Sequence, residues 1–80
     1  MSERLKHMGR RQEDKVKATG LKMGIEALRA SIRDNLDPFD TVEKINGDMV
    51  AELAMELAGK LIDYRAVLAE IQQLDEILGR

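Results

Sequence analysis

The sequence contains no cysteine and no tryptophan, and it has one proline, one tyrosine and one phenylalanine among its 80 residues. Without cysteine the chain has no disulfides, no thiolate zinc ligands and no thiol nucleophile. An aromatic content of 2% removes the large rings that dominate small cores and that stack on nucleic-acid bases. These absences exclude a small secreted disulfide scaffold and an aromatic base-stacking platform.

Long hydrophobic runs are also lacking. No stretch approaches the roughly 20 apolar residues that span a bilayer. Residues 1–15 are too polar for a secretory signal, because they are dominated by charged side chains. We therefore expect a cytoplasmic protein that has no membrane partner.

Histidine is nearly absent as well, since His7 is the only one. One histidine cannot form a catalytic dyad or a multi-histidine metal site within one chain. Asp34, Asp37 and Asp40 crowd one segment, but their spacing does not match the ligand positions of a helix-loop-helix calcium site. We therefore predict no enzyme, no catalytic residue, no cofactor and no metal site, and we assign these aspartates to helix capping.

The residues that are present are mainly aliphatic and charged, at 44% hydrophobic and 35% charged. A chain this short gains only about 3 to 5 kcal/mol from a core of its own, so small natural proteins add disulfides, metals or partner subunits. Because disulfides are missing here, the composition favours a homo-oligomer, with a dimer as the simplest form, or a further protein partner.

Charge is distributed unevenly along the chain. Residues 1–33 hold nine bases against four acids, a net charge of +5, whereas residues 34–80 hold four bases against eleven acids, a net charge of −7. A formal net charge of −2 therefore hides two oppositely charged halves. Such halves attract each other when the chain folds back on itself.

The first half predicts one amphipathic helix over about residues 3–35. Its apolar side chains recur at spacings of four, three and four, in the order Leu21, Ile25, Leu28 and Ile32. Over residues 1–12 the same stripe becomes polar, so this end is the part most prone to fray. Pro38 and the aspartates around it predict a turn over residues 35–40.

The second half predicts a helix over about residues 40–78, capped by Asp37 with Pro38 or by Asp40 with Glu43. Its apolar positions step by four and three, which is a heptad seam. The seam runs through Leu53, Leu57, Lys60, Tyr64, Val67, Ile71, Leu74 and Leu78.

The dipeptide Asn46-Gly47 offers an alternative start for this helix. It is a common turn signal, and Asp48 directly after it suits a helix N-terminus. The apolar spacing stays in phase on both sides, however, and an interior glycine costs only about 1 kcal/mol. We therefore favour a helix that continues through Gly47 over a helix that breaks there.

Together these elements predict an all-α fold, a long antiparallel helical hairpin or two-helix coiled coil over residues 1–80. A turn near residue 37 places residue i opposite roughly 75 − i, so Ile25 would meet Val50. The first helix has too few apolar residues to cover the second, which favours dimerisation into a four-helix bundle. The residues predicted to self-associate are Leu57, Leu61, Tyr64, Leu68, Ile71, Leu74 and Leu78.

Two functions remain open from the sequence. The favoured one is a non-enzymatic interaction or assembly module that self-associates through the second helix. The alternative is a nucleic-acid-associated accessory protein, in which the basic first helix contacts phosphates. The candidate phosphate contacts are Arg10, Arg11, Lys15 and Lys17.

Overall fold

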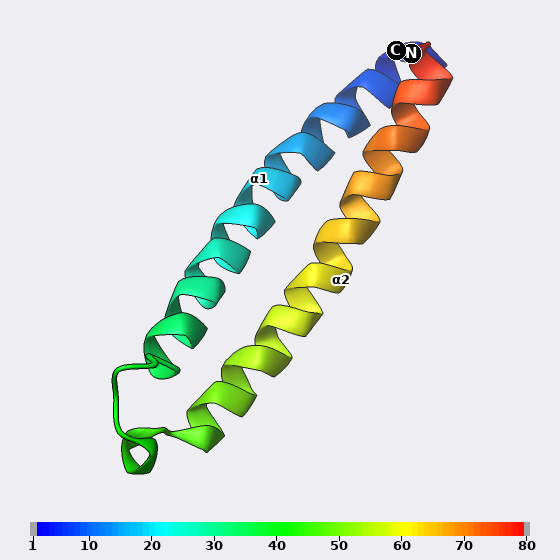
Figure 1. Ribbon diagram of the computed structural model, residues 1–80. Coiled ribbons are helices and arrows are strands. Elements are labelled where there is room, and N and C mark those ends of the chain that lie inside the picture. The colour runs from blue at the N-terminus through cyan, green and yellow to red at the C-terminus, as the bar shows by residue number, and fades with distance from the viewer. Residues whose placement is uncertain (1, 80) are drawn as a thin grey trace.

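The computed structural model describes residues 2–79 and consists of two long antiparallel helices joined by a loop (Figure 1). Helix α1 spans Glu3–Asn35 and helix α2 spans Gly47–Leu78. The molecule is a rod of 61 × 18 × 16 Å, and no strand occurs between residues 2 and 79. The predicted all-α helical hairpin is therefore confirmed.

Both helices carry caps that their sequences supply. At the start of α1, the Ser2 hydroxyl accepts a hydrogen bond from the Leu5 amide at 3.1 Å, which satisfies one of the free amides of the first turn. At the end of α2, Gly79 adopts a left-handed conformation with φ 75°, and its amide donates to the carbonyl of Glu76 at 3.2 Å.

The connection between the helices is longer than the predicted turn. It contains a short 3₁₀ helix, η1, at Val42–Lys44. The Asp37 carboxylate accepts a hydrogen bond from the Phe39 amide at 2.9 Å, and the Asp40 amide donates to the Asp37 carbonyl at 3.1 Å. Asp37 therefore closes a local turn, and the prediction that Asp37 or Asp40 caps the second helix is wrong.

Helix α2 begins at Gly47 rather than near residue 40, which corrects the predicted continuity through Gly47. The Asn46 side chain accepts a hydrogen bond from the Met49 amide at 3.1 Å. Asparagine has a carbonyl oxygen that caps a helix well, and its backbone here is non-helical, with φ −92° and ψ 89°. The local cap therefore outweighs the in-phase apolar spacing on either side.

The longer connection changes the register of the hairpin. A Cβ placed on Gly24 would lie 3.5 Å from the Cδ and Cε atoms of Lys60, whereas the predicted register set Gly24 against residue 51. The helices are thus displaced by about nine residues, or roughly two and a half turns, from the predicted pairing. Because Gly24 has no side chain, it leaves room for the aliphatic stem of Lys60 within the seam.

The core of the hairpin is thin. Its buried apolar side chains number three from each helix, and none of them is completely buried: Ala18, Ile25, Leu28, Val67, Leu74 and Leu78. The accessible surface is 6140 Å², against about 4,900 Å² expected for a compact chain of this mass. Outside the core, large apolar side chains such as Val16, Met23, Met55 and Ile62 remain exposed.

The cap at Asn46 gives a first prediction. The substitution Asn46→Ala removes the acceptor for the Met49 amide, and we expect it to lower the free energy of unfolding by about 0.5 to 2 kcal/mol. Asp40→Ala, at an exposed position in the loop, is the matched control and should change it little. Urea denaturation followed by circular dichroism measures both, and an equal loss in the two variants would contradict the observed helix start.

Candidate functional site

The heptad seam of α2 faces α1. Leu74 and Leu78 are buried there, and Leu57, Tyr64 and Ile71 are half-buried. Five of the seven residues predicted to self-associate therefore pack within the hairpin. The other two lie beside the seam, where Leu61 is half-buried and Leu68 is 42% exposed.

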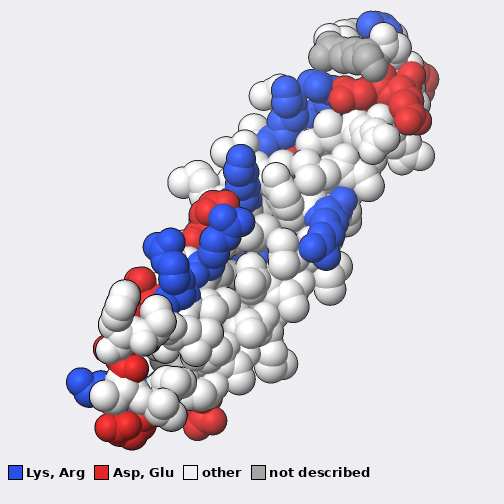
Figure 2. All heavy atoms as spheres, in the orientation of Figure 1, with Lys and Arg blue, Asp and Glu red and all other residues white. Residues whose placement is uncertain are grey.

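The opposite side of α2 carries a second apolar surface, which we call the outer face. Its positions alternate at spacings of three and four, half a turn away from the seam, and all of them are exposed: Ala51, Met55, Ala58, Ile62, Arg65 and Ala69. Met55 is 77% exposed and Ile62 is 67% exposed. On the face drawn in Figure 2, basic side chains gather over α1, whereas the visible surface over α2 is mainly uncharged apart from a basic group midway along it and acidic groups near its ends.

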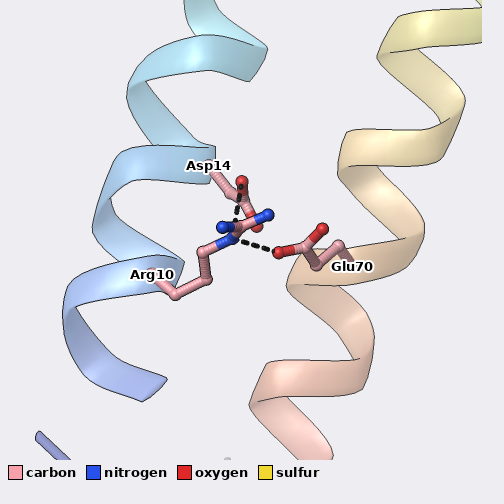
Figure 3. A network of polar contacts seen from close by, with 3 residues as sticks. All are labelled: Arg10, Asp14 and Glu70. Atoms are coloured by element: carbon pink, nitrogen blue, oxygen red, sulfur yellow. Dashed lines mark hydrogen bonds and ion pairs between the residues drawn. The ribbon is translucent and has the colours of Figure 1, made fainter. Parts of the chain in front are cut away.

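The open end of the hairpin holds charged contacts between the helices. The Arg10 guanidinium donates to the Glu70 carboxylate at 2.5 Å and lies 3.9 Å from the Asp14 carboxylate (Figure 3). Arg11 donates to Asp75, and Arg4 donates to the backbone carbonyl of Leu78 at 3.4 Å. Bases of the first half are thus matched with acids and carbonyls of the second half inside one chain.

Asp14 is the one charged residue among the buried residues of this end, with 6% of its surface exposed. Its Oδ2 atom is buried and has no hydrogen-bond partner in the described part of the chain. Burial raises the pKa of the Asp14 carboxyl, and the neighbouring Glu70 carboxyl raises this pKa further. The hydrogen bond from Arg10 lowers the pKa of Glu70, so Asp14 takes up a proton before Glu70 does.

Sequence reasoning missed this cluster of Arg10, Asp14 and Glu70 because the predicted register paired other residues. A signal for it was present, since the apolar stripe of the first helix becomes polar at Asp14 and Arg11. With the observed register, Arg10 and Arg11 meet acids of α2, so the mismatch in hydrophobicity becomes a match in charge at these two bases. Asp14 instead lies beside the like-charged Glu70.

The four candidate phosphate contacts lie in different surroundings. Arg10 and Arg11 are engaged by Glu70 and Asp75. Lys17 lines a surface depression together with Arg10, Asp14 and Glu70. Lys15 lies on the other side of the hairpin, beside an apolar groove lined by side chains of both helices: Ala18, Thr19, Lys22, Tyr64, Leu68 and Ile71. The structure does not bring the four bases together as one surface.

Between residues 2 and 79, no group of three histidine, aspartate or glutamate side chains is placed to hold a metal ion. Over the same residues, neither helix combines the length and apolar character that crossing a membrane requires.

Comparisons with protein families, with curated proteins and with solved structures found no match for this chain. The function is therefore argued from the geometry of the hairpin.

The raised pKa of Asp14 predicts that the stability of the hairpin depends on pH. Because the pKa of Asp14 is raised on folding, its contribution to stability is present below about pH 4 and is lost as the pH rises through the raised value. The Asp14→Asn variant has no carboxyl group at this position, so it does not lose this stability as the pH rises. We expect the melting temperature of the variant to exceed that of the original chain by a few degrees at neutral pH, and the difference to shrink toward about pH 4.

Thermal melts across this pH range test the prediction, with the exposed Glu13→Gln as the control. The lowered pKa of Glu70 has the opposite sign, since its contribution is lost as the pH falls. Its largest cause, the hydrogen bond from Arg10, is present in both chains and cancels in the comparison, whereas the smaller part that comes from Asp14 changes with the substitution. A difference between the chains that does not vary with pH would contradict a raised pKa at Asp14.

The ion pair of Arg11 and Asp75 gives a further prediction. The Arg11 side chain is only 17% exposed, so this pair is less screened than a surface pair. We expect Arg11→Met to lower the free energy of unfolding by about 1 to 2 kcal/mol. Lys15→Met, which removes the same charge from an exposed position, should cost less. Equal losses by chemical denaturation would show that charge matching across the hairpin contributes nothing specific.

Proposed function

We propose that this protein is a non-enzymatic interaction module that self-associates through the outer face of α2. The observation that carries the proposal is the exposure of large apolar side chains on a helix whose other side already packs in the hairpin. A helix that is apolar on both sides is typical of a helix with more than one neighbour. A contact between two copies would give four helices, with the two α2 helices in the middle.

The width of the apolar surface distinguishes α2 from α1. One turn away from Ile62 on α2 lie three small residues and one base: Ala58, Gly59, Ala66 and Arg65. Val16 on α1 is equally exposed, but at the same spacing it has mostly polar neighbours: Gln12, Glu13, Thr19 and Gly20. Broad uncharged surfaces are typical of contacts between proteins, whereas single exposed apolar side chains are common on any surface.

The accessible surface area of the chain can be compared with the area that a contact between two proteins covers. The accessible surface of 6140 Å² exceeds the surface of a compact chain of equal mass by about 1,200 Å². A contact of standard size covers about 800 Å² on each partner. The rod shape accounts for this excess, and the exposed Met55 and Ile62 are the side chains that a second copy would cover.

The alternative function, contact with nucleic acid through the first helix, has less support. Phosphate binding needs free bases, and Arg10 and Arg11 already pair with carboxylates of α2. We therefore favour protein contact, and we propose the cytoplasm as the place where the module acts.

The test compares two matched substitutions. Ile62 and Val16 are 67% and 65% exposed, and each lies in the middle of its helix. We expect the original chain to be a dimer at micromolar concentration, Ile62→Asp to make it monomeric, and Val16→Asp to leave it dimeric. Light scattering coupled to size exclusion measures the mass, and circular dichroism reports whether each variant keeps its helices.

Two results would overturn the proposal. One is an original chain that is folded and monomeric over the whole concentration range. The other is dissociation by Val16→Asp with no effect of Ile62→Asp, because this would place the contact on α1.

A further inference from the structure

We propose that two copies of this chain join through an antiparallel contact between their α2 helices, in which Asp48 of each copy pairs with Arg65 of the other. This inference rests on the proposed self-association. It adds the orientation and the register of the contact.

Asp48 lies one turn before the outer face of α2 and continues its spacing, and together they form an ordered pattern over residues 48–65. Six exposed positions follow each other at spacings of three and four: an acid, a small residue, a large residue, a small residue, a large residue and a base. In sequence order they are Asp48, Ala51, Met55, Ala58, Ile62 and Arg65. The first residue and the last residue have opposite charge, and small and large residues alternate between them.

This pattern is complementary to itself when it is reversed. In an antiparallel pair the first position meets the last, so each Asp48 meets an Arg65. The next positions set Ala51 against Ile62, and the middle positions set Met55 against Ala58. Each large side chain then faces an alanine, which allows the helices to interdigitate without voids or overlap.

A parallel pair would have the opposite result. Equal positions would face each other, so Asp48 would meet Asp48 and Arg65 would meet Arg65, which is repulsive. The large side chain of Ile62 would also meet its own copy. The antiparallel arrangement in addition aligns the helix dipoles favourably.

Arg65 has surroundings that favour a partner from outside its own helix. The residues three and four positions away along α2, which are its neighbours on the helix surface, are all apolar: Leu61, Ile62, Leu68 and Ala69. None of these positions carries a carboxylate that could pair with Arg65. In the antiparallel contact, Asp48 of the second copy supplies one.

The contact fits the length of the molecule. Residues 48–65 extend about 26 Å along the helix axis, within a rod of 61 Å. It covers the part of α2 nearer to the loop and ends just past the middle of the helix. The open end, where Glu70 and Asp75 pair with Arg10 and Arg11, stays outside the contact and keeps its ion pairs.

Exchange of the two charges tests the pairing. Asp48→Arg and Arg65→Asp each replace both ion pairs of the dimer by like charges, and we expect each to weaken dimerisation about tenfold. The double variant restores opposite charges and should return the dissociation constant to within about threefold of the original. Analytical ultracentrifugation measures these constants.

Circular dichroism of the same samples checks that the cap at Asn46 still starts α2 when Asp48 is replaced. The comparison between the double and the single Asp48 variant is unaffected by any change at the helix start, because both carry the same residue there. Single variants that dimerise normally, or a double variant weaker than both, would overturn the pairing.

Cysteine cross-linking tests the orientation independently, because the chain has no cysteine of its own. The variants are Ala51→Cys and Ile62→Cys, oxidised with glutathione disulfide either separately or as a mixture. We expect the mixture to form a disulfide-linked heterodimer and each variant alone to form little linked product, since a disulfide needs the two Cα atoms within about 7 Å. A parallel contact would instead link each variant with itself.

The outcomes separate the two proposals. A monomeric original chain overturns the proposed function and this inference together. A dimer that links each cysteine variant with itself, or that ignores the charge exchange, overturns only the antiparallel contact and leaves self-association in place.

Discussion

The helix cap at Asn46 is the local interaction on which the arrangement of the hairpin depends. By starting α2 at Gly47, it lengthens the connection between the helices and shifts their register. That shift brings Lys60 over Gly24 in the middle of the molecule. It also brings Arg10 and Arg11 to Glu70 and Asp75 at the open end. The cap at Asn46 and the register of the two helices thus occur together in the structure.

The seam is held by two kinds of interaction. Aliphatic side chains are buried along it, from Ile25 and Leu28 to Leu74 and Leu78, and the open end adds ion pairs between the helices. The polar contacts at the open end carry an energetic cost at Asp14, since one of its carboxylate oxygens is buried and has no hydrogen-bond partner among the described residues. The open end is therefore the part of the hairpin that depends most on pH.

Helix α2 has two apolar surfaces, and α1 covers only one of them. Side chains such as Val67 and Leu74 are buried against α1, while Met55 and Ile62 remain exposed on the outer face. Because α1 is a single helix, it cannot reach both sides of α2. This geometric limit links the thin core of one chain to the proposed contact between two chains.

The sequence by itself determined the two helices and their antiparallel connection, because these depend on local spacing, such as that of Leu21, Ile25 and Leu28, and on the break at Pro38. It did not determine where α2 starts, since the cap at Asn46 and the in-phase spacing through Gly47 favoured different answers. Only the tertiary structure decided the register, and with it the cluster of Arg10, Asp14 and Glu70 and the exposure of Ile62. The reason is physical: periodicity is set within a helix, whereas pairing between helices depends on the length of the loop that joins them.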